Sequence, residues 1–115
     1  TATRAPHENY YHGFLNGIFT NCKDNLGEYH SNIESGDGYP DIIFKDTGYR
    51  KVAIIEIKSA PIGSDIVTIS EQAVAQIEDK NYAEPLMSNK TVKSVYGYGI
   101  TFAGKSCAIS VKKLK

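Results

Sequence analysis

One stretch of the chain, residues 51–58, restricts the fold more than any other. Its first part is apolar without interruption from Val52 to Ile55. Because successive side chains on a strand point to opposite faces, such a run must be covered on both sides, which is typical of a central strand. The same stretch then carries Glu56 and Lys58, two residues apart and therefore on one face. The sequence thus predicts a central strand that presents a carboxylate and an ammonium group on the same face.

Helical and strand periodicities alternate along the rest of the chain. Apolar residues recur at helical spacing between residues 7 and 23, and again after Ser64 or Asp65, either of which can cap a helix that Pro85 is expected to stop. The predicted strands are residues 28–34, 39–45, 51–58, 92–102 and 106–111. The order α-β-β-β-α-β-β mixes helices with strands, so we expect an α/β fold with a central mixed sheet flanked by helices.

Length and composition limit the class of protein. The chain has 115 residues, 41% of them hydrophobic and 23% charged, with a net charge of zero. These values are typical of one globular domain and argue against a disordered chain. No apolar run approaches the roughly 20 residues of a membrane-spanning helix, and no signal peptide opens the chain. Because an initiator Met is also missing, we expect a single domain, residues 1–115, excised from a longer cytoplasmic protein.

Two further features bear on the redox surroundings and on charge. Cys22 and Cys107 have no CxxC spacing, and we expect two buried thiols of a protein from a reducing compartment. Acids dominate residues 1–41, whereas the part after Glu84 holds six lysines and no acid. This basic end either binds phosphate groups or is a solvated lysine face or an unstructured tail, and charge alone leaves these interpretations open.

A second carboxylate is expected beside Glu56. Asp41 follows Gly38-Tyr39-Pro40 on the preceding predicted strand, and a hairpin turn separates the two strands, so they should be adjacent and antiparallel. Two carboxylates and the Lys58 ammonium group would then meet at one end of the sheet. A divalent cation such as Mg²⁺ or Mn²⁺ compensates paired carboxylates, and the lysine can orient a water or stabilise negative charge. These groups suit metal-assisted hydrolysis of a phosphodiester.

Five stretches of this sequence resemble a known family. They are residues 8–14 (ENYYHGF), 34–41 (ESGDGYPD), 54–58 (IIEIK), 76–82 (QIEDKNY) and 98–105 (YGITFAGK). In this order they look like the PD-(D/E)XK nuclease superfamily, and most closely like the nuclease-like domain at the C-terminal end of bacterial proteins that begin with an AAA-ATPase-like domain. The resemblance implies a restriction-endonuclease-like α-β-β-β-α-β core.

The resemblance also implies roles for individual residues. Asp41 and Glu56 would be metal ligands with the Ile57 carbonyl oxygen as a third, and Lys58 would be the catalytic lysine. The two helices would add further site residues. Glu8 would be an additional acid at the metal; its alternative is a first-turn acid that the helix dipole stabilises. Gln76 would face the site; its alternative is a polar residue on the helix surface. The residues implied in nucleic-acid binding are Lys80, Tyr82, which can instead pack in the core, and Lys105 of the basic C-terminal part.

Three readings of the sequence compete. The first is a nuclease that uses Mg²⁺ or Mn²⁺ and cleaves nucleic acid, with DNA the favoured substrate. The second is a binding or regulatory module that keeps the nuclease fold without cleaving and acts with the AAA-ATPase-like domain of the same full-length protein. The third is a generic α/β domain in which Glu56 and Lys58 form an exposed same-face pair. A homodimer, with one strand cut by each subunit, stays open.

Overall fold

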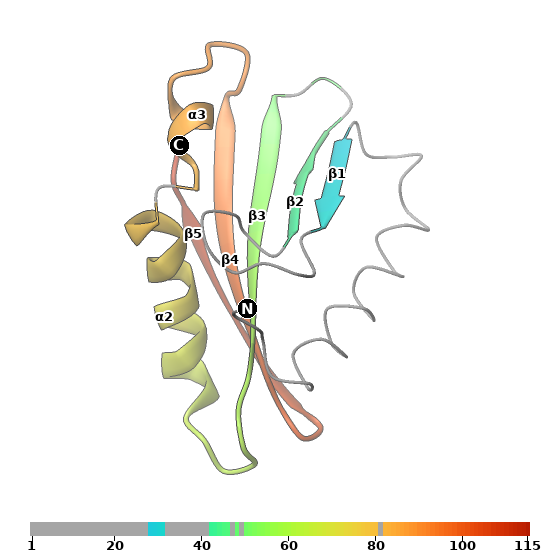
Figure 1. The fold of residues 1–115 in the computed structure, drawn as a ribbon, viewed down its shortest axis with the longest axis vertical. Coiled ribbons are helices and arrows are strands. Elements are labelled where there is room, and N and C mark those ends of the chain that lie inside the picture. The colour runs from blue at the N-terminus through green and yellow to red at the C-terminus, as the bar shows by residue number, and fades with distance from the viewer. Residues whose placement is uncertain (1–27, 32–41, 47, 49, 81) are drawn as a thin grey trace, which may run out of the picture.

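A computed structural model describes residues 28–31, 42–46, 48, 50–80 and 82–115. Within these residues the chain forms a five-stranded sheet in the order β1-β2-β3-β4-β5, so that strand order follows chain order. Figure 1 shows the sheet with one long helix lying along it. The strands are β1 (Glu28–Ser31), β2 (Ile42–Lys45), β3 (Lys51–Ser59), β4 (Ser94–Ala103) and β5 (Ser106–Lys113).

Strand β3 occupies the centre of the sheet, as its uninterrupted apolar run predicts. It pairs with β2 in antiparallel orientation and with β4 in parallel orientation, and its positions from Val52 to Ile57 are all buried. The turn into β3 is fixed by Asp46, whose Oδ1 accepts hydrogen bonds from the backbone N–H groups of Arg50 (2.7 Å) and Lys51 (3.1 Å). The bond from Lys51 and then that from Arg50 hold the pKa of Asp46 below its usual value.

A helical crossover joins the parallel strands β3 and β4, as parallel pairing requires. Helix α2 (Ile66–Asp79) begins at the N-cap Asp65, whose carboxylate accepts bonds from the Thr68 N–H (3.1 Å) and hydroxyl (2.8 Å). The prediction that Pro85 stops this helix is wrong. Helix α2 ends at Asp79, and Pro85 lies in the first turn of a short helix α3 (Glu84–Met87), where a missing N–H costs nothing because it would have no partner inside the helix.

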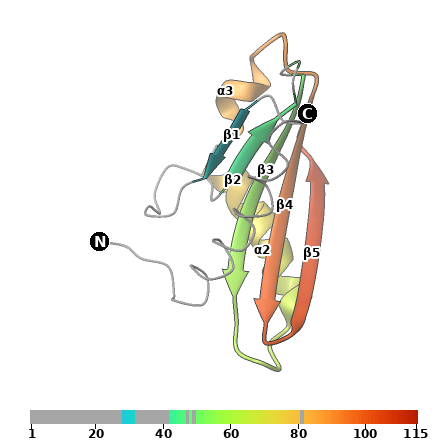
Figure 2. The same ribbon diagram turned by 90° about the vertical axis from the view of Figure 1, so that its right-hand side faces the viewer.

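The sheet has an apolar core on each face. On the face covered by α2, the cluster combines even-numbered β3 residues with residues of the helical crossover and of β4; its members include Val52, Ile54, Ile77, Leu86 and Val95. On the opposite face, Ile55 and Ile57 cluster with Ile42 of β2 and Ile100 of β4. Figure 2, turned by 90°, shows α2 on one side of the sheet only. The alternation of β3 side chains therefore decides which of them lie under α2.

The basic C-terminal part is ordered structure and not an unstructured tail. Strand β5 extends to Lys113, beyond the predicted end at residue 111. Lys112 forms an ion pair with Glu78 of α2 (2.8 Å), and the Lys115 ammonium group donates to the carbonyl oxygens of Leu86 (3.1 Å) and Asn89 (2.9 Å). Two of the lysines thus attach this end of the chain to the helical crossover.

The expectation of two buried thiols is wrong for Cys107. This free cysteine is exposed on β5, which lies at the edge of the sheet, and partial desolvation raises the pKa of its thiol. Cys22 and the helix expected at residues 7–23 lie outside the described residues, as do the ends of two predicted strands, residues 32–34 and 39–41. In the part of the chain that is described, no helix is long and apolar enough to cross a membrane.

Candidate active site

Glu56 and Lys58 lie on the face of β3 that α2 covers. Ile54, two residues earlier on the same strand, packs in the cluster with Ile77 of α2, and strand alternation places Glu56 and Lys58 on that side. Only 3% of the Glu56 surface is exposed, while Lys58 is half-buried. The interpretation of this pair as surface decoration required both side chains to be exposed, so the burial of Glu56 contradicts it.

The close approach of α2 to the sheet depends on Gly99 of β4, the register partner of Glu56. A Cβ added at Gly99 would overlap the Ser70 carbonyl oxygen of α2 and lie 2.9 Å from the Ala73 Cβ. Sequence reasoning did not assign Gly99 this role, although a glycine inside a strand is a signal of close backbone approach. Helix α2 therefore lies directly over Gly99, the residue beside Glu56 in the sheet.

The two flanks of α2 are identified by its contacts with β5. The Glu78–Lys112 ion pair and a 2.8 Å hydroxyl contact between Ser70 and Ser110 of β5 join one flank to that strand. Helical periodicity places Gln76, which is half-buried, on the other flank, toward β3. Gln76 lies about 9 Å further along the helix axis than Ser70, at about 1.5 Å per residue. Gln76 is thus on the face that bears Glu56, one to two turns away from the level of Gly99.

The second carboxylate of the expected site, Asp41, and the additional acid, Glu8, lie outside the described residues. The neighbouring pairs are known: Ile42, which directly follows Asp41, is the antiparallel partner of Ile55. The side chain of Ile57, whose carbonyl oxygen the family resemblance assigns to the metal, is buried on the opposite face with Ile55 and Ile100. The Ile42–Ile55 pair confirms the prediction that β2 and β3 are adjacent and antiparallel.

The described residues provide part of a metal-binding donor set. They contain no group of three or more His, Cys, Asp or Glu side chains that could hold an ion. At the candidate site they offer one buried carboxylate, Glu56, and backbone oxygens. Carboxylate and carbonyl oxygens are the donors that Mg²⁺ and Mn²⁺ favour, so the donor types present suit such an ion. A complete ligand set also needs the expected carboxylates of Asp41 and Glu8.

The three residues implied in nucleic-acid binding lie in different surroundings. Tyr82 is only 8% exposed and packs in the core cluster under α2 and α3, which corresponds to its packing alternative. Lys80 is the exposed C-cap residue of α2. Lys105 is exposed in the β4–β5 turn, at the end of the sheet where β3 finishes (Figure 1). Since α2 is 14 residues long, or about 21 Å, Lys80 and Lys105 lie at opposite ends of the helix, and Lys105 is at the Lys58 end.

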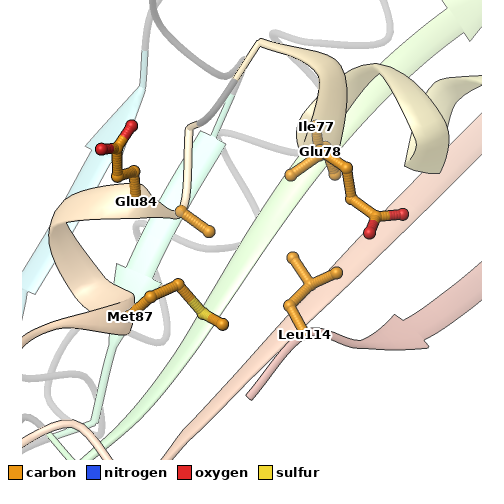
Figure 3. A pocket seen from close by; sticks show the side chains of 6 residues that line it. Ile77, Glu78, Glu84, Met87 and Leu114 are labelled. Carbon is orange, nitrogen blue, oxygen red and sulfur yellow. The ribbon is translucent and has the colours of Figure 1, made fainter.

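A pocket of about 260 Å³ lies elsewhere, between the end of α2, helix α3 and the last residues of the chain. Figure 3 shows Met87 and Leu114 converging on it, with the carboxylates of Glu78 and Glu84 on opposite sides. None of the sequence-predicted site residues that the structure describes lines it. Its lining residues are apolar apart from Glu78, which is paired with Lys112, and Glu84, so this pocket is not the candidate active site.

Comparison with known proteins agrees with the geometry on the α2-covered face. The sequence matches the family model of the PD-(D/E)XK nuclease superfamily over residues 6–112. No curated protein and no solved structure matches the chain. The family match spans both strands of the β2–β3 hairpin, the helical crossover and the parallel β3–β4 pair, and the mixed α/β sheet is consistent with a restriction-endonuclease-like fold. The chain therefore belongs to the PD-(D/E)XK nuclease superfamily.

Proposed function

We propose that the protein is a metal-dependent nuclease that hydrolyses phosphodiester bonds, with DNA as the favoured substrate. The observation that carries the proposal is Glu56, a carboxylate with 3% exposure in the central apolar strand, followed on the same face by half-buried Lys58. Burying a carboxylate costs free energy that an apolar residue at this position would not. A catalytic role accounts for a charged pair in a place where folding alone favours apolar side chains.

The proposal assigns the metal to Asp41 and Glu56, with the Ile57 carbonyl oxygen and Glu8 as further donors. It rests on continuing the antiparallel register by one residue: since Ile42 pairs with Ile55, the next pair would be Asp41 with Glu56. Partners in an antiparallel pair share a face, which would bring the two carboxylates together. When bound, a divalent ion supplies charge stabilisation at phosphoryl oxygens and lowers the pKa of a bound water.

The remaining residues have roles set by their chemistry. The Lys58 ammonium group has three donors and no acceptor, so it suits orientation of a water and stabilisation of negative charge on the phosphoryl oxygens. Gln76 lies on the β3-facing flank of α2, one to two helical turns from the level of Gly99, where its amide would contact the substrate and not Glu56 or Lys58 directly. Lys105 is placed at the same end of the sheet as Lys58 and can pair with a backbone phosphate.

Metal binding is the first test, because it needs no choice of substrate. Titration calorimetry with Mn²⁺ on the wild-type protein should give one saturable site, and Asp41→Asn should abolish it. Glu71→Gln is the matched control, since Glu71 is an exposed carboxylate of α2, and it should bind Mn²⁺ as the wild type does. Saturable binding that survives Asp41→Asn would refute the assigned metal site.

Cleavage separates the lysine from the metal ligands. With Mg²⁺ or Mn²⁺ present, Lys58→Ala should keep Mn²⁺ binding and lose at least about 100-fold in the rate of DNA cleavage, the usual scale for a group that assists proton transfer or stabilises charge. Lys113→Ala, an exposed lysine of β5, is the control and should cleave normally. Equal cleavage by Lys58→Ala and wild type would refute the role of Lys58.

The alternative is a non-cleaving module that acts with an AAA-ATPase-like domain. Its supporting observation is charge: the net charge is zero and the pI is about 6.8, which is unfavourable for an independent nucleic-acid binder, and Lys112 and Lys115 contact α2 and the segment after it. This alternative predicts neither Mn²⁺ binding nor cleavage by the wild-type protein, together with binding to an ATPase-like domain.

A further inference from the structure

Thr101 of β4 carries a hydroxyl group that the fold leaves without a partner. The residue is 0% exposed, and its Oγ1 is a buried side-chain polar atom with no hydrogen bond within the described residues. Strand alternation puts Thr101 on the same face as Gly99, under α2. Most buried polar groups in folded proteins are hydrogen-bonded, so an orphaned hydroxyl in this position needs a physical reason.

A second buried hydroxyl group on the same side of the sheet, that of Ser70, is fully hydrogen-bonded and serves as a comparison. Ser70 of α2 is also 0% exposed, but its Oγ makes two hydrogen bonds, one to the Val67 carbonyl oxygen (2.7 Å) and one with the Ser110 hydroxyl (2.8 Å). Valine has nearly the shape of threonine and would leave nothing unpaired at position 101. Leaving a buried polar group without a hydrogen bond lowers the folding equilibrium constant by about 5- to 150-fold. Threonine at position 101 carries this cost, and valine would not.

The register places Thr101 directly beside the candidate catalytic lysine. Lys58 of β3 and Thr101 of β4 are Cα partners in the parallel ladder, and Glu56 and Gly99 are the preceding partners on that face. No hydrogen bond or ion pair joins the Lys58 ammonium group to another described residue. A lysine can only donate, whereas a threonine hydroxyl can also accept. The two unpaired groups are thus complementary and adjacent.

We propose that Thr101 is a positioning residue for Lys58: its Oγ1 accepts a hydrogen bond from the Lys58 ammonium group, directly or through one water, when a phosphate group occupies the site. This inference rests on the proposed function and extends it by one residue that the superfamily signature does not contain. The bond limits the directions in which the flexible lysine can point, so that the remaining N–H donors face the phosphoryl oxygens. Thr101 itself, being buried, does not contact the substrate.

Two variants with opposite effects on stability test the role. Thr101→Val should unfold in urea at the same concentration as wild type or a higher one, because it removes an unpaired hydroxyl. It should nevertheless reduce kcat for DNA cleavage by about 10- to 100-fold, the rate equivalent of one charge-assisted hydrogen bond, with KM and Mn²⁺ affinity unchanged. Thr101→Ser, which restores the hydroxyl, should recover most of the rate. Ser70→Ala should do the reverse, losing stability while kcat stays at the wild-type value.

A spectroscopic measurement separates failure of this inference from failure of the proposed function. Reductive methylation with ¹³C labels each lysine and keeps its charge and one N–H, and the Lys58→Arg variant identifies the Lys58 signal. With Mg²⁺ and inorganic phosphate added, Thr101→Val should shift that signal relative to wild type, and Ser70→Ala should not.

The outcomes divide clearly. Unchanged kcat and an unchanged Lys58 signal in Thr101→Val overturn the inference while leaving the nuclease proposal intact. If the wild-type protein neither binds Mn²⁺ nor cleaves, the proposed function fails, and the Lys58 signal alone decides: a shift in Thr101→Val still supports the contact between the two residues, and no shift overturns it.

Discussion

Replacing Gly99 by alanine tests the central geometric statement about the site, namely that α2 lies against β4 at the residue beside Glu56. The added Cβ would overlap the Ser70 carbonyl oxygen and lie 2.9 Å from the Ala73 Cβ, and both of those atoms belong to the body of the helix. No side-chain rotation can relieve this overlap, so α2 must move away from the sheet. The movement would also separate Ser70 from Ser110 and weaken the hydrogen bond between their hydroxyl groups.

The magnitude follows from two opposing terms. Overpacking a core costs about 1–3 kcal/mol, and the upper end applies here because backbone has to shift. Replacing glycine by alanine in a strand recovers about 0.5–1 kcal/mol of chain entropy. The net loss should be about 2 kcal/mol or more. With a urea m-value of about 2 kcal/mol per M, the unfolding midpoint should fall by about 1 M or more.

Gly97 provides the matched control, because it lies two residues away on the same strand and face. The nearest atoms to a Cβ at Gly97 would all belong to side chains: the Ile77 Cδ1 at 3.3 Å, the Leu114 Cδ1 at 3.4 Å and the Leu114 Cγ at 3.8 Å. These are ends of flexible side chains that can adjust by a few tenths of an ångström, so Gly97→Ala should change stability by less than about 1 kcal/mol. Equal urea midpoints for Gly99→Ala and Gly97→Ala would show that α2 does not approach β4 as described.

Three further predictions concern the helix cap, a surface ion pair and the core. The Thr68 hydroxyl and N–H lower the pKa of Asp65, so the stability that its carboxylate adds is present above the ordinary pKa of 3.8 and is lost as the pH falls below that value. The difference in thermal midpoint between wild type and Asp65→Ala should therefore narrow from pH 6 to pH 2.5. Lys112 and Glu78 are both exposed, at 56% and 42% of their side-chain surface, so a double-mutant cycle should give a coupling of about 0.2–1 kcal/mol that declines with salt. A larger, salt-independent coupling would contradict a surface pair. Ile54→Ala, at a position with 0% exposure, should cost about 2–5 kcal/mol in urea unfolding, and a cost below this range would mean that the α2-side core is loosely packed.

Much of the fold is readable from local sequence signals. The apolar run from Val52 to Ile55 has to be covered on both faces, and this requirement alone places β3 in the middle of the sheet. The hairpin turn after β2 implies the antiparallel pairing, and the helical spacing after Asp65 implies the crossover that parallel pairing needs. Each of these signals depends only on residues close together in the chain.

The errors arise where distant segments decide the outcome. Pro85 fits either the end of one helix or the start of another, and only the packing of Leu86 and the bonds from Lys115 to α3 and the turn after it select the second. Cysteine is among the residue types most often buried, which led to the wrong expectation for Cys107. Its strand β5 lies at the edge of the sheet, and its side chain is exposed. For the site, the sequence identifies Glu56 and Lys58 together, but it does not place Gly99 and Thr101 beside them, because their position depends on the β3–β4 register.

The register divides the α2-covered face of β3 and β4 into two halves with different chemistry. Toward the start of both strands the face is apolar, with Val52, Ile54 and Val95 packed in the core cluster. Toward their carboxyl ends, the same face carries Glu56 and Lys58 on β3 beside Gly99 and Thr101 on β4. A core selected only for stability would continue the apolar pattern to the carboxyl ends of both strands, under the first turns of α2. Ligand sites in α/β sheets lie at the carboxyl ends of parallel strands, so the change from apolar to polar residues occurs where a site is expected, and the apolar half provides the rigid support that holds it.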